Sequence, residues 1–329
     1  MHRSTTPPVA MATFGPVPSR RLGRSLGINN IPPKTCSYAC IYCQLGRTLQ
    51  LQTERAAFYD PVLLFDEVAK RLDAVRSAGE NVDFLSFVPD GEPTLDLNLG
   101  RLIELLRPLG SEIAVITNSS LLWRPEVRDE LATADWISLK MDTVRDETWR
   151  RMNRPHGRLR LAEILDGALA MASAFDGRLM TETMLVEGIN DRQEHVEELA
   201  MFLARLGPET AYLAIPTRPP GEAEVRPPHE DALTRAWSIL SSELDDVELL
   251  TGYEGNAFFT SGRAEEDLLA ITSVHPMRAD AVDGLLRRSG EDWSLVQRLL
   301  GEGELIEVRY GGWSFFVRKL KPARRNANS

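Results

Sequence analysis

All three cysteines of this 329-residue chain lie close together, at positions 36, 40 and 43. An odd number of cysteines cannot complete a set of disulfides, and a structural zinc site usually takes four protein ligands in separated pairs. Thiolates also favour iron–sulfur clusters, and a [4Fe–4S] cluster held by three of them leaves one iron open to a small molecule. The spacing C-x3-C-x2-C therefore predicts a loop around one open-site cluster. Zinc completed by a distant ligand and unpaired structural thiols are the alternatives.

Composition and charge limit the kind of protein that carries this loop. The hydrophobic fraction of 43% and the charged fraction of 26% are ordinary for a globular chain. The N-terminus has no apolar run and no stretch reaches the length of a membrane helix, so we expect a cytoplasmic protein without a membrane anchor. The net charge is −10, and the acidic excess lies before Arg263, which argues against broad, sequence-independent binding of nucleic acid.

A repeated strand–helix pattern occupies most of the chain, about six βα units long. An ordered lead-in precedes the first strand. It contains Arg20, Arg21 and Arg24, for which a solvated loop is favoured over an anion site. The strands are mostly continuous apolar runs, which indicate a parallel sheet covered by helices, either a barrel or an open sheet. In both, ligands bind at the carboxyl ends of the strands, where the cysteine loop also falls. Strands are expected at 26–31, 82–88, 113–117, 136–141, 178–186, 212–215 and 247–251, and helices at 61–79, 99–109, 125–131, 161–175, 194–206 and 231–244.

The pattern changes at about residues 252–263, which predicts two domains, 1–252 and 253–329. Three short helices at 264–274, 279–288 and 292–300, followed by a hairpin of 305–310 and 313–320 with a Gly-Gly turn, have the order of a winged helix. Its third helix offers Gln297 and Arg298 but few other groove-reading side chains, among acidic neighbours, so DNA binding is not expected. A lid or partner-docking module is favoured, with RNA contact left open. A basic tail ends the chain.

Two motifs resemble those of the radical S-adenosylmethionine (radical SAM) superfamily. One is the cysteine loop with Tyr42 before its last cysteine, and the other is Asp90-Gly91-Glu92-Pro93-Thr94 at the end of the next strand. Shorter stretches at 117–119, 153–156, 188–191 and 216–220 resemble a subgroup related to the tRNA wyosine-base synthases. Those synthases carry upstream cysteines for a second cluster, which this chain lacks, so their substrate is not carried over.

The resemblance implies a partial (βα)6 radical SAM barrel with a small C-terminal winged-helix-like domain. It also implies an enzyme in which a reduced [4Fe–4S] cluster cleaves S-adenosylmethionine, and the resulting 5′-deoxyadenosyl radical abstracts hydrogen from a substrate. A reductant such as a flavodoxin or ferredoxin is expected, whereas the substrate, a small molecule or an RNA, is not identified. The alternative is a non-enzymatic iron–sulfur regulator that binds nucleic acid through the winged helix.

Individual site residues follow from the resemblance and from their strand positions. The expected cluster ligands are Cys36, Cys40 and Cys43. The expected S-adenosylmethionine contacts, including a close backbone approach at the glycine and an ammonium contact at the glutamate, are Tyr42, Gly91, Glu92, Asn118, Lys140, Val186 and Ile215. Glu182, which interrupts an apolar strand, and Asp142 and Arg218, near strand ends, are the expected substrate-facing residues. A buried salt bridge for Lys140, a turn for Asn118 and loop packing for Tyr42 are the competing interpretations.

Overall fold

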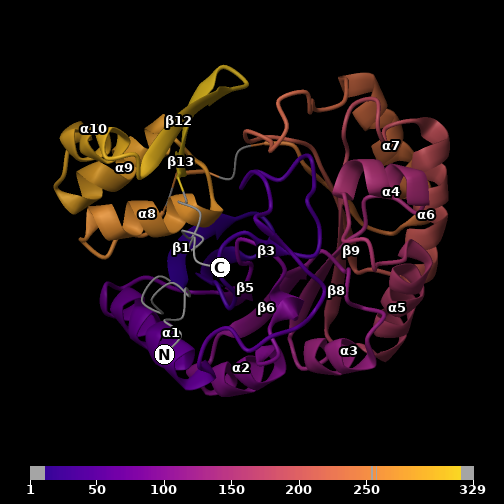
Figure 1. Ribbon diagram of the computed structural model, residues 1–329, viewed down its shortest axis with the longest axis horizontal. Helices are drawn as coiled ribbons and strands as arrows, with labels where there is room; N and C mark the ends of the chain where they lie inside the picture. Colours follow the sequence, from indigo (N-terminus) through magenta and orange to yellow (C-terminus); the bar gives the residue numbers. More distant parts are fainter. Residues whose placement is uncertain (1–11, 253–254, 257, 320–329) are drawn as a thin grey trace, which may run out of the picture.

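An eight-stranded sheet forms the centre of the computed structural model, which describes residues 12–252, 255–256 and 258–319 (Figure 1). The strand order is β1-β2-β5-β6-β7-β8-β9-β10, with β1 antiparallel to β2 and every later neighbour parallel. The strands are β1 (Thr13–Ser19), β2 (Gly23–Ile28), β5 (Phe84–Phe87), β6 (Glu112–Thr117), β7 (Trp136–Lys140), β8 (Arg178–Met184), β9 (Thr210–Ala214) and β10 (Val247–Leu250).

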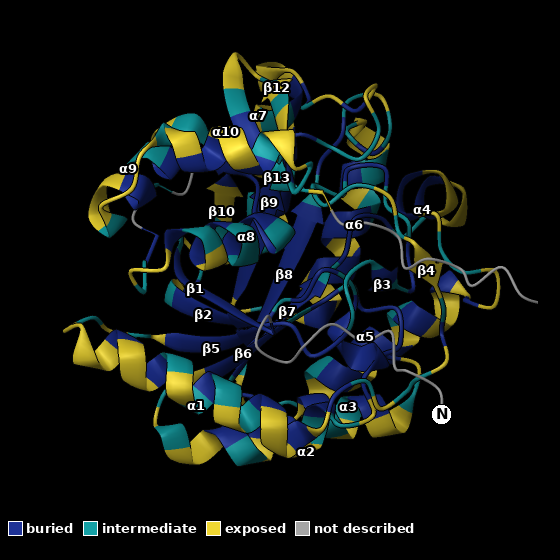
Figure 2. Cartoon of the chain, turned by 60° about the vertical axis from the view of Figure 1, so that its left-hand side comes forward, coloured by how far each residue is buried: buried dark blue, intermediate teal, exposed yellow. Residues whose placement is uncertain are grey.

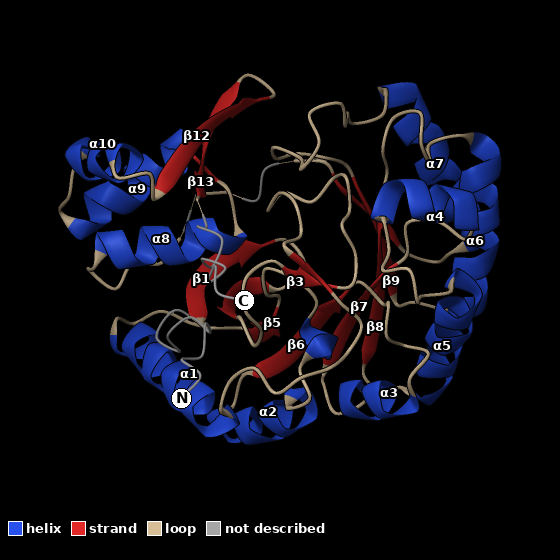
Figure 3. Ribbon diagram, viewed as in Figure 1, coloured by secondary structure: helices blue, strands red, loops and turns tan. Residues whose placement is uncertain are grey.

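The sheet curls into an open, partial barrel, with the helices on its outer side (Figure 3). The α/β class and the partial barrel predicted from the sequence are therefore confirmed. The covering helices are α1 (Pro61–Ser77), α2 (Leu99–Leu106), α3 (Pro125–Leu131), α4 (Asp146–Asn153), α5 (Leu161–Ala174), α6 (Gln193–Leu206) and α7 (Glu230–Glu243). None of the described helices combines the length and the apolar character that a membrane span requires.

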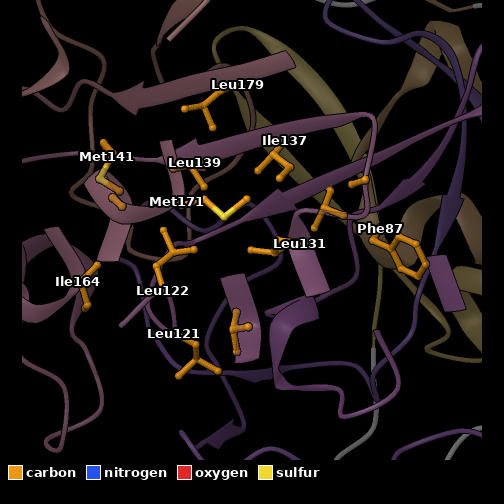
Figure 4. Packing of buried hydrophobic residues seen from close by; sticks show 14 of the residues in the cluster. Phe87, Leu121, Leu122, Leu131, Ile137, Leu139, Met141, Ile164, Met171 and Leu179 are labelled. Atoms are coloured by element: carbon orange, nitrogen blue, oxygen red, sulfur yellow. The ribbon is translucent and has the colours of Figure 1, made fainter. Parts of the chain in front are cut away.

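Local sequence explains the regular elements well. The Asp60 carboxylate caps α1 by accepting from the Val62 amide at 2.8 Å, and Leu64, Val68 and Leu72 bury one face of that helix. Strands β5 and β9 are buried at every residue, which is why they have no polar alternation (Figure 2). Between sheet and helices lies an apolar core, shown in Figure 4.

The lead-in to the cysteine loop differs from the prediction, because residues 13–28 form an antiparallel pair, β1 and β2. Pro16 and Pro18 are tolerated in β1 because it is an edge strand. The Phe14 ring lies over Gly27 and packs into the hydrophobic core of the C-terminal helices. No local pattern reveals this role, because the C-terminal residues of that core lie more than two hundred residues after Phe14.

The C-terminal part has its own apolar core and contains all the helices and strands predicted there. These are α8 (Ala264–Val274), α9 (Ala279–Ser289), α10 (Trp293–Gly301), β12 (Leu305–Tyr310) and β13 (Trp313–Arg318). An unpredicted strand, β11 (Met277–Arg278), completes a three-stranded sheet in the order β11-β13-β12. The basic tail, the expected strand end at residue 320 and residues 253, 254 and 257 of the expected domain boundary lie outside the described residues.

Candidate active site

The cysteine loop leaves β2 at the carboxyl edge of the sheet. It begins with a two-residue strand, β3 (Thr35–Cys36), which pairs with β4 (Gln50–Leu51), and then turns so that the Cys43 amide donates to the Cys40 carbonyl at 3.2 Å. All three cysteine side chains are half-buried and line one cavity of about 270 Å³. The sequence prediction that the cysteines share the functional edge of the sheet therefore matches their position.

The turn around Gly91 holds this loop from one side. The Lys34 amide donates to the Asp90 carbonyl at 2.7 Å, and the Glu92 amide donates to the Thr35 carbonyl at 3.2 Å. Gly91 has a φ of +153°, and a Cβ placed on it would lie 1.8 Å from the Thr35 carbonyl oxygen. Only glycine fits here, because both the backbone conformation and the close approach of the two loops exclude a side chain.

The end of α4 holds the loop from the other side. The Ala39 amide donates to the Asn153 carbonyl and the Ile41 amide to the Met152 carbonyl, each at 3.0 Å. This helix was not predicted from the sequence, because its eight residues are mostly charged or polar and present little apolar periodicity. Its tertiary contacts with the cysteine loop stabilise it.

Two asparagine side chains approach the cysteine sulfurs. The amide nitrogen of Asn118 lies 3.5 Å from Cys36 Sγ, and that of Asn153 lies 3.5 Å from Cys40 Sγ. Amide donors of this kind stabilise negative charge on thiolate sulfur. Asn118 was predicted to contact a ligand at the end of β6, whereas Asn153 was noted only as part of a motif.

A buried charged group lies on the sheet beside the thiols. Lys140 Nζ donates to Glu182 Oε1 at 2.7 Å, and the Arg21 guanidinium bonds the other oxygen of the same carboxylate. Burial disfavours the Lys140 ammonium, but the carboxylates of Glu182 and Asp142 offset this effect and raise the pKa of Lys140 above its ordinary value. The salt bridge that was the competing interpretation for Lys140 is thus present, and the Lys140 side chain also lines the cavity.

The thiols lie in an environment that disfavours their ionisation in the absence of a bound cation. Burial raises the pKa of Cys40 to about 12, with a further contribution from the Asp142 carboxylate. Burial likewise raises the pKa of Cys36 and of Cys43. Since metal–sulfur bonds require thiolates, metal binding here is coupled to the release of protons.

Most of the predicted site residues face the cavity that the thiols share. Besides the three cysteines these are Tyr42, Gly91, Asn118, Lys140, Glu182, Ile215 and Arg218. Three predicted residues do not line it: Glu92, Asp142 and Val186.

Glu92 and Asp142 are instead buried within the protein. The Glu92 side chain is fully buried. Its carboxylate accepts hydrogen bonds from the hydroxyls of Thr94 and Thr117 and from the backbone amide of Asn118. Its position does not support the predicted contact between its carboxylate and an ammonium group, because its oxygens tie the Gly91 turn to the end of β6. The Asp142 carboxylate accepts a hydrogen bond from the Tyr42 hydroxyl and another, at 2.7 Å, from the side-chain amide of Asn153. Asp142 therefore positions the Tyr42 ring rather than facing the cavity.

Val186 is displaced because β8 ends earlier than predicted. The strand stops at Met184, and the Val186 amide donates to Asn190 Oδ1 at 2.9 Å in the following turn. Val186 belongs to the same buried apolar cluster as Tyr42, whereas Met184 lines the cavity. Glu182 and Met184 are two residues apart in β8, so their side chains point to the same face of the sheet.

The cavity also includes residues that the sequence did not single out as site residues. Arg20, Arg21 and Gln44 line it. Gln44 Oε1 accepts from Arg218 at 2.8 Å, and the other terminal nitrogen of Arg218 lies 2.7 Å from His275 Nε2, at the end of α8. The cysteine loop, the loop after β9 and the C-terminal part are thus joined at this point. The proximity of Gln44 to Cys43 in sequence was an available signal for its position. Arg20 and Arg21 were weighed as an anion site, but a solvated loop was favoured, whereas both line the cavity.

The donor set fits an iron–sulfur cluster. The part of the chain that the structure describes contains no three or more cysteine, histidine or carboxylate side chains converging as the ligands of a single metal ion do. A [4Fe–4S] cluster does not need such convergence, because its thiolates bind different iron atoms. Three thiols on one cavity, two amide donors beside their sulfurs and a glycine turn without room for a Cβ form a suitable cradle.

This chain is similar to known proteins both in sequence and in fold. A model of the radical SAM superfamily matches residues 30–203. A UPF0026 protein of Methanocaldococcus jannaschii is 43% identical over 96% of this chain and 98% of its own length, and one of Helicobacter pylori strain 26695 is 31% identical over 94% and 97%. Among solved structures, a radical SAM methyltransferase from Sphaerobacter thermophilus has a TM-score of 0.54 at 18% identity. That match covers 69% of this chain and 66% of the other, and it supports the fold alone.

Proposed function

This chain belongs to the radical SAM superfamily of enzymes, and from this premise we propose that it uses one [4Fe–4S] cluster to cleave S-adenosylmethionine reductively. Cys36, Cys40 and Cys43 would hold the cluster. Bound there, the reduced cluster supplies the electron that splits S-adenosylmethionine into methionine and the 5′-deoxyadenosyl radical, which abstracts hydrogen from the substrate.

The observation that carries this proposal is the shared cavity of the three thiols. They are the only cysteines in the chain, and they open onto the same space as Asn118, Lys140 and Ile215. That space lies at the carboxyl ends of parallel strands, where α/β folds bind their ligands. Three protein thiolates leave one iron without a protein ligand, and the cavity offers room for a small molecule beside it.

The chain's own residues have distinct proposed roles. Tyr42, Asn118, Lys140 and Ile215 contact S-adenosylmethionine, and the backbone at Gly91 approaches its methionine part. Glu92 fixes this turn from behind. Val186 shares a buried apolar cluster with Tyr42 and does not line the cavity, so its role is to support Tyr42 rather than to contact the ligand.

The substrate side of the cavity carries charge. We propose that Glu182 and Arg218 face the substrate, with Asp142 acting as a positioning residue through Tyr42.

A flavodoxin or ferredoxin would supply the electron, and the cytoplasm is the proposed compartment because thiols stay reduced there. The domain division remains 1–252 and 253–329, the second being a winged-helix-like domain.

The alternative function, a non-enzymatic iron–sulfur regulator that binds nucleic acid through the winged helix, has weaker support. Its expected reading helix is α10, where Arg298 is the cationic side chain best placed to meet phosphate. The Arg298 guanidinium instead bonds Glu265 at 2.6 Å and Glu302 at 3.2 Å. These carboxylates offset its charge, so α10 offers little attraction to a duplex.

Anaerobic reconstitution tests the enzyme proposal. Wild-type protein supplied with iron and sulfide should show the absorption of a [4Fe–4S] cluster and, with dithionite and S-adenosylmethionine, should form 5′-deoxyadenosine detectable by mass spectrometry. Cys40→Ala should lose both, whereas Ser173→Ala, at an exposed helix position, should keep both. A wild-type cluster that never yields 5′-deoxyadenosine would contradict the proposal.

A further inference from the structure

A second, larger cavity lies directly beside the cluster cavity. Its volume is about 840 Å³, and it is formed between the loops after β9 and β10 and the β12–β13 hairpin of the C-terminal part. The two cavities share Ile215, Pro216 and Thr217, so a molecule in one can extend into the other. We call the larger cavity the hairpin groove.

The charge of the hairpin groove is opposite to that of the chain as a whole. The chain carries a net charge of −10, yet the described residues that line the groove include three arginines, Arg226, Arg278 and Arg309, and no aspartate or glutamate. Arg278 is paired with Asp280 at 2.7 Å, but Arg226 and Arg309 are exposed to solvent. This local excess of guanidinium groups favours an anionic ligand and, above all, phosphate.

An aromatic surface accompanies these arginines. Trp313 is 52% exposed although it is a large apolar side chain, and the Arg278 guanidinium lies 3.5 Å from the centre of its ring. Tyr310 also lines the groove, and its hydroxyl donates to the Pro216 carbonyl at 3.0 Å. That bond fixes the hairpin to the loop shared with the cluster cavity. An exposed indole beside guanidinium groups is suited to stack against a planar ring.

From these observations we propose that the hairpin groove binds a nucleoside phosphate, either free or within a single-stranded polynucleotide, as part of the substrate. The phosphate lies against Arg226 and Arg309, and the base stacks on Trp313. The ligand then reaches past Ile215–Thr217 toward the cluster cavity. This assignment rests on the proposed radical SAM function and specifies the substrate class for it.

Binding to the reconstituted protein tests the proposal without turnover. The probe is a fluorescein-labelled, mixed-sequence, single-stranded RNA at low salt, read by fluorescence anisotropy, with adenosine monophosphate and adenosine as competitors. We expect Arg309→Glu to weaken RNA binding about tenfold or more, because it reverses a charge at the phosphate. Trp313→Ala should weaken it about fivefold or more through lost stacking. The matched control Arg287→Glu, at an exposed position of α9 outside the groove, should bind within about twofold of wild type.

The competitors distinguish the two sources of the ligand. Displacement of the probe by adenosine monophosphate as effectively as by unlabelled RNA indicates a free nucleotide, and much weaker displacement indicates a polynucleotide. Unchanged binding by Arg309→Glu would overturn the assignment, and so would displacement of the probe by a polyglutamate peptide as effectively as by unlabelled RNA. Where adenosine monophosphate does displace the probe, equally effective displacement by adenosine would also overturn it, because the phosphate would then contribute nothing. Formation of 5′-deoxyadenosine without RNA is measured in parallel, so that failure of the radical SAM function is distinguished from failure of the groove assignment.

Discussion

Lys140 and Glu182 are register partners on the neighbouring parallel strands β7 and β8, and their side chains form an ion pair of 2.7 Å beside the cysteine loop. The same carboxylate also bonds Arg21, from the turn between β1 and β2. One buried acid therefore compensates two cations from distant parts of the chain. This arrangement links the first and the central strands of the sheet at the cavity wall.

Replacing Glu182 by alanine should destabilise the fold, because the half-buried cations Lys140 and Arg21 would then lose their shared carboxylate. We expect the free energy of unfolding to fall by about 3–5 kcal/mol in urea titration. Glu112→Ala removes an exposed partner of Arg178 and should cost less than about 1 kcal/mol. Equal losses for both variants would show that the buried group has no special structural importance.

Gly91→Ala should loosen the cysteine loop. The new Cβ would meet the Thr35 carbonyl oxygen at 1.8 Å, so we expect a loss of about 3 kcal/mol in unfolding free energy together with poor cluster incorporation. Gly157 has no atom within 4 Å of its Cβ position, so Gly157→Ala is a matched control with little expected effect. Normal stability of the Gly91 variant would disprove the tight approach of the two loops.

Asn118→Ala should lower the reduction potential of the reconstituted cluster. The Asn118 amide lies 3.5 Å from Cys36 Sγ, and a donor to a ligand sulfur stabilises the more negative, reduced state. A redox titration followed by electron paramagnetic resonance measures this shift. Asn98→Ala, whose amide contacts the Tyr59 carbonyl instead, is the control and should leave the potential unchanged. An Asn118→Ala potential equal to that of wild type would rule out the contact to sulfur.

Asp96 should make stability depend on pH. Burial raises the pKa of Asp96 to about 7, although the hydrogen bonds that its carboxylate accepts from Asn98 and Asn30 act to lower it. Its pKa in the unfolded chain is about 4, so between about pH 4 and 7 the folded state binds more protons than the unfolded state. The free energy of unfolding should therefore fall as the pH rises through this window.

Asp96→Asn should reduce this slope, because asparagine does not titrate. Urea unfolding at several pH values measures it, and Asp129→Asn, on the exposed surface of α3, should keep the wild-type slope. An unchanged slope for Asp96→Asn would assign the pH dependence to other groups, such as Asp90, whose pKa burial raises to about 6.

Sequence alone was sufficient where the determining interactions are local or periodic. Apolar runs and a capped helix such as α1 identified the α/β sheet and its order of elements. The rule that parallel strands carry their sites at the carboxyl edge then placed Cys36, Gly91 and Asn118 around one space. The C-terminal helices and hairpin were predicted on the same basis.

Only the tertiary structure decided which side chains meet across the chain. Strand β1 depends on apolar partners near residue 268, α4 depends on the cysteine loop, and Arg21 depends on Glu182, and none of these pairs shares a local pattern. The sequence likewise contains Arg309 and Trp313 without indicating that they line a groove beside the cluster cavity. Long-range packing decides these positions, because it brings together residues whose separation along the chain carries no periodic signal.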